Sequence, residues 1–217
     1  MEPNSTGESQ RIKRVLETLE TAYPDAATEL VHQNPFQLLI ATMLSAQTTD
    51  RQVNKVTPGL FKKFPDARAM AAADISEIED MIKTCGFYKT KAKNIKEACR
   101  IITAKHNGKV PDNLKELISL PGVGRKTANV VLSNAFGADA IAVDTHVFRV
   151  SNRLGLAEAK DVRGTEEQLM ENIPKEKWSR AHHWLIHHGR RICKARKPMC
   201  SECPLSELCM YSGREHL

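Results

Sequence analysis

The chain has 217 residues, which suits one large domain or two small lobes with a real hydrophobic core. Its formal net charge of +6 at pH 7 favours a polyanionic partner without identifying one. No stretch is apolar over the ~20 residues that a membrane span needs. Residues 1–7 are polar and contain no signal-peptide core, so we expect a cytoplasmic protein without disulfides.

Apolar residues recur at helical spacing from the first segment onward, as at Ile12, Val15, Leu16 and Leu19. The alternation typical of strands is nearly absent, so the sequence predicts an all-α fold. Short breaks between helices are expected at the prolines, namely Pro24, Pro58, Pro65, Pro111, Pro121 and Pro174.

Three helix ends carry recognisable signals. Asn34 and Pro35 predict the N-cap and first residue of a helix that is apolar nearly all round, so it should run through the middle of the fold. Asp74 and Glu77 predict the start of another helix, and Gly86 is expected to end it.

A Pro-Gly-Val-Gly turn at residues 121–124 separates two apolar helical segments. Gly122 and Gly124 permit positive φ and expose backbone N–H groups at a helix N-terminus, a geometry suited to phosphate. A plain helical hairpin with a glycine turn is the alternative interpretation.

Lys126 falls in the first turn of the second hairpin helix, beside Arg125. The positive helix end, the neighbouring cation and partial desolvation favour a neutral amine, which makes Lys126 a candidate nucleophile. Phosphate contact is the simpler alternative for this lysine. Asp144 precedes another helical segment, where an aspartate commonly serves as N-cap.

Four cysteines follow the spacing Cys193-x6-Cys200-x2-Cys203-x5-Cys209. Structural zinc sites usually carry paired C-x2-4-C knuckles, whereas one such pair flanked by wider gaps favours an iron–sulfur cluster. Zinc remains the alternative. The other two cysteines, Cys85 and Cys99, are expected to be buried thiols without a metal.

Positive charge gathers around these cysteines, at Arg190, Arg191, Lys194, Arg196 and Lys197. We expect these residues to contact phosphate, and a solvated basic tail is the alternative. Four nearby histidines lack the glutamate and further ligands of a zinc helix, so we interpret them as structural or as facing the polyanionic partner: His182, His183, His187 and His188.

Taken together, these segments resemble the endonuclease III family of DNA repair glycosylases. The strings that carry the resemblance are L-P-G-V-G-R-K-T-A at 120–128, V-D-T-H-V-F-R-V at 143–150, the cysteine spacing, and shorter matches at 34–36, 45–47, 91–95 and 182–186. The resemblance therefore covers almost the whole chain.

The resemblance implies a [4Fe-4S] cluster held by the four cysteines. It implies a six-helix barrel with a helix-hairpin-helix at residues 28–138, and a cluster lobe built from residues 1–27 and 139–217. Double-stranded DNA with damaged bases or abasic sites would lie in a cleft between these two helical lobes. We expect a monomer in the bacterial or archaeal cytoplasm, with the nucleoid.

The resemblance also implies a bifunctional enzyme that removes oxidised pyrimidines and cuts the strand by β-elimination. Lys126 would be the nucleophile, and Asp144 would assist it. Gln47 would fill the gap left by a flipped base, and Phe87 replaces the leucine that the family usually carries in its wedge loop. The other implied DNA contacts are Gly122, Gly124, Arg125, Arg190, Lys194, Arg196 and Lys197, and the implied lesion pocket is Ser45, Asp50 and His146.

Two other functions fit parts of the sequence. A monofunctional adenine or thymine mismatch glycosylase of the same superfamily typically lacks the lysine found at position 126. A non-catalytic, metal-stabilised DNA-binding module explains the charge, the hairpin and the cysteines, but it leaves the pairing of Lys126 with Asp144 without a reason.

Overall fold

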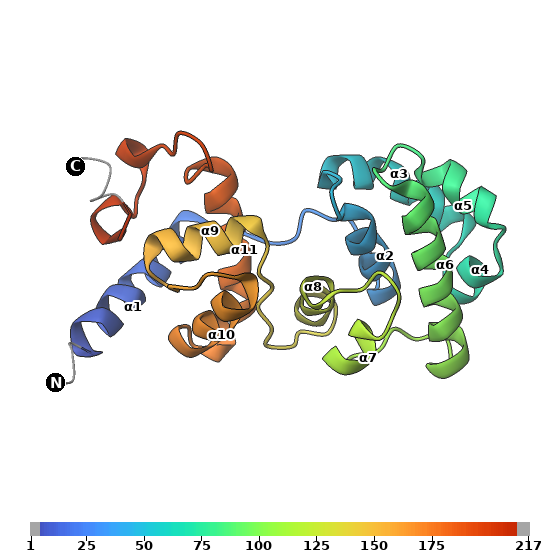
Figure 1. Cartoon of the computed structure of the whole chain (residues 1–217), viewed down its shortest axis with the longest axis horizontal. Coiled ribbons are helices and arrows are strands. Elements are labelled where there is room, and N and C mark those ends of the chain that lie inside the picture. Colours follow the sequence, from blue (N-terminus) through green and yellow to red (C-terminus); the bar gives the residue numbers. More distant parts are fainter. Residues whose placement is uncertain (1–4, 212–217) are drawn as a thin grey trace. The chain divides into compact units, whose positions relative to one another are not determined.

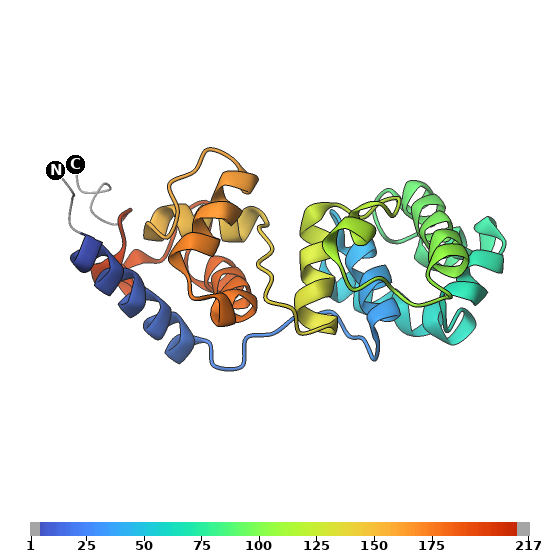
Figure 2. The same ribbon diagram turned by 90° about the horizontal axis from the view of Figure 1, so that it is seen from below.

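The computed structural model describes residues 5–211, and all regular structure in that range is helical (Figure 1). The predicted all-α class is confirmed. The chain forms two compact units: a central unit of residues 28–138 and a terminal unit from residues 1–27 and 139–217. Two stretches of chain connect them (Figure 2). Among the described helices, none has the length and apolar character that crossing a bilayer requires.

The central unit consists of α2 Pro35–Ser45, α3 Asp50–Lys63, α4 Ala67–Ala72, α5 Ile75–Ile82, α6 Tyr88–Lys105, α7 Leu114–Ile118 and α8 Arg125–Ala135. Helix α2 packs against α3, α6 and α8, and its residues Phe36 and Leu38–Leu44 are buried. Asn34 caps α2 by accepting a hydrogen bond from Gln37 N at 2.9 Å, and Pro35 is the first residue. The predicted central helix and its start are confirmed.

Two predicted helix boundaries are wrong. Pro58 lies inside α3, where burial of Val53, Leu60 and Phe61 on one face outweighs the ~3 kcal/mol that an interior proline costs. Helix α5 begins after Asp74 as predicted, but it ends at Ile82 and not at Gly86. Gly86 instead lies beside the next loop, since a Cβ there would lie at an ordinary contact distance of 3.5 Å from the carbonyl oxygen of Gln47.

The hairpin is formed by α7 and α8. Gly122 has a φ of +77°, whereas Gly124 has a φ of −87° and is the N-cap of α8. Only one of the two glycines therefore uses the left-handed conformation that both were expected to permit. Between them Val123 is buried, with 5% of its surface exposed, and it anchors the turn to the core.

We predict that Gly122→Ala destabilises the protein by about 1–3 kcal/mol, because a Cβ would be strained at positive φ and would crowd its neighbours. That Cβ would lie 2.9 Å from the Cβ of Asn94 and 3.1 Å from the Cε of Met43. Gly124→Ala is the matched control, since a Cβ there meets nothing within 4 Å. Denaturant unfolding of both variants measures the difference, and equal losses would contradict the prediction.

The terminal unit consists of α1 Ser5–Ala22, α9 Thr145–Leu154, α10 Val162–Asn172, η1 Lys175–Lys177, α11 Trp178–Arg191, η2 Cys200–Glu202 and η3 Ser206–Leu208. Helix α11 packs against α1 and α9, and Trp184 at its middle is fully buried. Val15, Leu16 and Leu19 of α1 belong to the same core. The N-terminal helix is thus an integral part of a unit whose other members follow residue 138.

The four histidines of α11 are buried, and they serve the structure of this unit. His182 Nδ1 donates to the carbonyl of Ala142 at 2.6 Å, and His188 Nδ1 pairs with the Tyr23 hydroxyl at 2.9 Å. Burial lowers the pKa of His183 to about 3 and that of His188 to about 4, so both are neutral at pH 7. The structural interpretation of these histidines agrees with their surroundings.

Candidate functional site

The four cysteines of the C-terminal loop line one cavity in the terminal unit. Cys193 follows the end of α11, and Cys200 begins η2. Cys203 and Cys209 are the residues directly after η2 and η3, so each short turn delivers a thiol at its end. Cys193 is buried, and the other three are half-buried. The sequence spacing therefore brings all four sulfurs to the same place.

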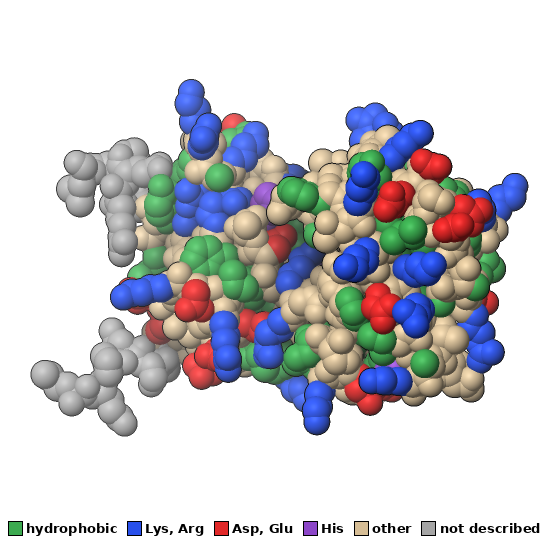
Figure 3. All heavy atoms as spheres, turned by 45° about the vertical axis from the view of Figure 1, so that its right-hand side comes forward, with side chains coloured by type: hydrophobic (Ala, Val, Ile, Leu, Met, Phe, Trp, Pro, Cys, Tyr) green, Lys and Arg blue, Asp and Glu red, His purple; other side chains and the backbone are tan. Residues whose placement is uncertain are grey.

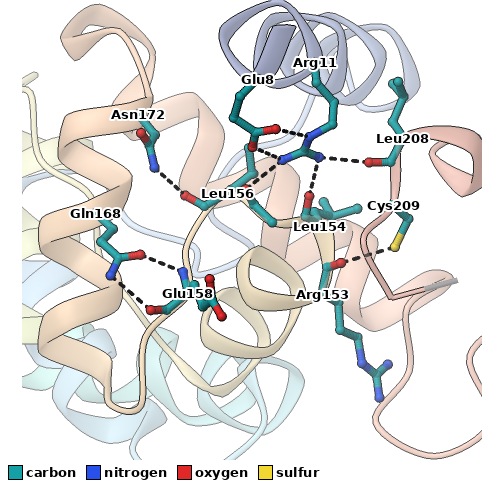
Figure 4. Close-up of polar contacts among 11 residues, drawn as sticks. Glu8, Arg11, Arg153, Leu154, Leu156, Glu158, Gln168, Asn172, Leu208 and Cys209 are labelled. Atoms are coloured by element: carbon teal, nitrogen blue, oxygen red, sulfur yellow. Dashed lines mark hydrogen bonds and ion pairs between the residues drawn. The ribbon is translucent and has the colours of Figure 1, made fainter. Parts of the chain in front are cut away.

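Arginines of α9 and α1 bind the backbone around this cavity. Arg149 donates through Nε and Nη2 to the carbonyl of Cys193, at 3.1 and 2.9 Å. Arg153 Nη1 lies 2.9 Å from the Lys194 carbonyl and 3.5 Å from Cys193 Sγ. Arg11 reaches the carbonyls of Leu154 and Leu208, and the Cys209 thiol lies against the Arg153 carbonyl (Figure 4). These contacts fix the shape of the loop.

The donor set around the cavity fits an iron–sulfur cluster. Four cysteine side chains line one cavity, and four thiolates are the ligand set that such a cluster needs. Burial raises the pKa of the Cys203 thiol, so metal binding must displace its proton.

The two remaining cysteines are buried in the central unit, as predicted. Burial raises the pKa of Cys99 to about 12, and it also raises the pKa of Cys85. Both are therefore protonated thiols at neutral pH, which do not ligate metals.

We predict about four iron and four sulfide per chain in anaerobically purified protein, with broad visible absorption. Cys203→Ser should lose most of the iron and the colour, because one of the four ligands is removed. Cys99→Ala is the matched control, since this cysteine lies in the other unit, and it should keep both. Iron and sulfide assays with absorption spectra measure this, and stoichiometric zinc in the colourless wild-type protein would refute it.

Asp144 is the N-cap of α9, as its position predicted. Its Oδ1 accepts hydrogen bonds from the backbone N–H groups of His146 and Val147, both at 2.8 Å. Its other carboxylate oxygen makes no hydrogen bond among the described residues, so a negative charge remains available beside the helix start. His146 Nδ1 accepts from Arg149 Nη2 at 3.2 Å, which places the proton of a neutral ring on Nε2.

Lys126 is the second residue of α8 in the central unit, whereas Asp144 belongs to the terminal unit. Its side chain is half-buried, and its amine makes no hydrogen bond or ion pair within residues 5–211. Arg125, one residue before it, is exposed. The amine at the positive end of a helix is thus available to a reacting partner.

Gln47 and Phe87 are exposed residues with left-handed backbone, at φ +54° and +56°. Phe87 exposes 68% of its surface, which is a large cost for an aromatic ring without a partner. The two loops are neighbours, because a Cβ on Gly86 would lie 3.5 Å from the Gln47 carbonyl. Exposed residues with left-handed backbone on neighbouring loops are typical of a functional edge.

The expected pocket residues are placed less distinctively. The Ser45 hydroxyl donates to the Thr42 carbonyl at 2.9 Å, so it already has a partner in the last turn of α2. Asp50 is the first residue of α3, and Thr49 is the N-cap of that helix. His146 lies on α9 in the other unit from both.

The basic residues of the C-terminal loop are exposed: Arg190, Arg191, Lys194, Arg196 and Lys197. Lysine and arginine side chains are prominent on the face of the molecule in Figure 3. Lys197 adopts positive φ at +54°. The sequence did not single out Arg149, Arg153 or Lys91, whose side chains hold the loops in place through partners more than 40 residues away.

Residues 40–175 match the family of HhH-GPD superfamily base excision DNA repair proteins, and residues 193–209 match the iron-sulfur binding domain of endonuclease III. Endonuclease III of a Synechocystis species is 52% identical over 201 residues, covering 92% of each chain. A trapped endonuclease III–DNA covalent intermediate is structurally similar, with a TM-score of 0.91, 50% identity, and coverage of 96% of this chain and 99% of that one. A thermostable thymine-DNA glycosylase matches with a TM-score of 0.86 at 28% identity, over 95% of this chain and 99% of that one.

Proposed function

This chain belongs to the endonuclease III family of base excision DNA repair proteins, and we propose that Lys126 and Asp144 carry its chemistry. The protein is a DNA glycosylase and AP lyase that acts on DNA and binds a [4Fe-4S] cluster. Its substrates are oxidised pyrimidines in double-stranded DNA, together with abasic sites. The observation that carries the assignment is the half-buried Lys126 at the start of α8, whose amine has no partner within residues 5–211.

The reaction begins when the damaged nucleotide is flipped out of the stack, which costs a few kcal/mol. The amine of Lys126 attacks C1′ of the deoxyribose, and the base leaves with the electron pair of the glycosidic bond. The sugar ring then opens as O4′ takes a proton, which leaves a protonated Schiff base on Lys126. Loss of a proton from C2′ expels the 3′ phosphate, and water releases the cut strand from the lysine.

Asp144 supports this reaction through its charge. Because Oδ1 is committed to the two N–H groups of α9, the carboxylate is held in one orientation. It stabilises the positive charge that develops on the sugar as the base departs, or it accepts a proton from the attacking amine. The Asp144 side chain thus serves both as the N-cap of α9 and as an electrostatic group in the reaction.

Cys193, Cys200, Cys203 and Cys209 are the proposed ligands of the cluster. When it is bound, the cluster cross-links four points of the C-terminal loop. This loop presents Lys194, Arg196 and Lys197, and Arg190 precedes it at the end of α11. These side chains contact phosphates without reading sequence.

The hairpin and the two neighbouring loops are the proposed contacts of the central unit. Gly122, Gly124 and Arg125 approach the backbone phosphates at the start of α8. Gln47 fills the space of the flipped base, and the Phe87 ring stacks on the vacated bases. Ser45, Asp50 and His146 are proposed to line the lesion pocket.

The central unit is the proposed barrel domain with the hairpin, and the terminal unit is the proposed cluster domain. We further propose that the protein acts as a monomer in the bacterial cytoplasm, with the nucleoid. A mismatch glycosylase without lyase activity is the weaker candidate, since such enzymes typically lack the lysine that occupies position 126.

Lys126→Gln should bind lesion DNA but lose base excision, strand cleavage and borohydride trapping together, because one amine performs all three. We expect losses of at least about 10³-fold in single-turnover rates. Lys115→Gln is the control, since it removes an exposed lysine from α7 of the same hairpin. Near-normal trapping by Lys126→Gln would assign the nucleophile to another amine.

Asp144→Asn should slow excision by about 10²-fold or more with little change in unfolding free energy, because the amide keeps the cap and removes the charge. Asp161→Asn is the matched control, since Asp161 caps α10 through Gly164 N at 2.8 Å. If both variants lost activity in proportion to stability, the role of Asp144 would be structural only.

A further inference from the structure

Lys91 is a buried cation outside the proposed chemistry. It lies in the first turns of α6 with 8% of its surface exposed, and burial lowers its pKa. Its Nζ donates to the carbonyl of Leu44 and to the hydroxyl of Thr48, both at 2.8 Å. A buried ammonium group is costly unless it is hydrogen-bonded, and these two acceptors engage two of its three N–H donors.

Both acceptors flank the loop that carries Gln47. Leu44 belongs to the last turn of α2, where carbonyl groups lack helical partners and a cation is favoured. Thr48 follows Gln47 directly, on the other side of the strained residue. The Lys91 side chain thus binds one residue on each side of Gln47, namely Leu44 before it and Thr48 after it.

Lys91 is also joined to the second strained loop. Its backbone N–H donates to the carbonyl of Phe87 at 3.0 Å, which is the first turn of α6. The left-handed conformations of Gln47 and Phe87 each cost about 1 kcal/mol or more, so the surrounding contacts must hold them. Lys91 provides such a contact to both loops, through its side chain to Leu44 and Thr48 and through its backbone to Phe87. The two loops are neighbours, because a Cβ on Gly86 would lie 3.5 Å from the Gln47 carbonyl.

We propose that Lys91 is a positioning residue that holds Gln47 and Phe87 as one rigid edge for insertion into the duplex. The inference rests on the proposed function of these two residues. A cation bonded only to the Leu44 carbonyl would satisfy the end of α2 without fixing the loop. A side chain bonded to both Leu44 and Thr48 fixes the loop between them.

Lys96 is a matched control from the same helix. Its Nζ donates to the carbonyl of Ala73, the C-cap residue of α4, at 2.6 Å. It therefore supports a helix end as Lys91 does, but its described hydrogen bond goes to neither the loop of Gln47 nor that of Phe87. Comparing Lys91→Met with Lys96→Met separates loop positioning from general support of a helix terminus.

The test uses the full chain with its cluster. Base unstacking is followed by the fluorescence of 2-aminopurine placed next to the lesion, and excision by single-turnover kinetics on duplex DNA. Lys91→Met should reduce the fluorescence rise and slow duplex excision by about 10- to 100-fold. Its lyase rate on an abasic site in single-stranded DNA, where no stack has to be opened, should stay within about twofold of wild type. Lys96→Met should leave all three measurements unchanged.

Thr48 provides a second pair of variants in case Lys91→Met does not fold. Thr48→Val keeps the shape and removes the acceptor, so duplex excision should fall by about three- to tenfold. Thr48→Ser keeps a hydroxyl, so its rate of duplex excision should be close to that of the wild type. Equal rates of duplex excision in Thr48→Val and Thr48→Ser would overturn the positioning role. Equal losses of that rate in Lys91→Met and Lys96→Met would also overturn it.

The proposed insertion of Gln47 and Phe87 into the duplex can be tested separately. If the double variant Gln47→Ala with Phe87→Ala excised normally, no rigid edge would be needed and the positioning role of Lys91 would be refuted. The proposed lysine chemistry would be untouched by that result, because borohydride trapping on single-stranded abasic DNA measures it separately. Absence of trapping in the wild-type protein would instead overturn the proposed function.

Discussion

Carbonyl oxygens at helix ends have no partner within their own helix, and this all-helical protein supplies many of their donors from distant cationic side chains. Arg11 of α1 binds the carbonyls of Leu154 and Leu208, at the ends of α9 and η3. Lys91 does the same for α2. In a fold without sheets, these long-range bonds connect one helix to the terminus of another and fix where each loop begins.

The same use of cations changes how the positive charge of the sequence must be understood. Arg149 and Arg153 lie within reach of the cysteine loop, yet both direct hydrogen bonds inward to its backbone. These inward hydrogen bonds fix the shape of the loop, and the shape of the loop determines where its exposed cations lie. Charge that holds the loop and charge that faces solvent are therefore separate sets, although both count equally in the net charge.

Helix starts could be predicted from the sequence because their signals are local. Contacts between residues far apart in the chain could not be predicted. The caps at Asn34 and Asp144 follow from side-chain chemistry within three residues, and both are present. The cysteine spacing along one short loop favoured an iron–sulfur cluster over zinc, and the family resemblance implied the [4Fe-4S] cluster. The α3 helix continues through Pro58 because of packing by residues elsewhere, and Lys91 resembles any other lysine of α6 until its partners 43 and 47 residues away are known. Long-range contacts of this kind leave no periodic pattern.

The discontinuous terminal unit imposes an order on the folding of the nascent chain. Residues 28–138 are contiguous, so the central unit can fold once its last helix has left the ribosome. Helix α1 is synthesised first, but the Leu154 carbonyl that Arg11 binds lies 143 residues later. The apolar face of α1 thus stays uncovered throughout synthesis of the central unit. The four cysteines are synthesised after α9 and α11, so the cluster can be inserted only after the helices around its site have been made.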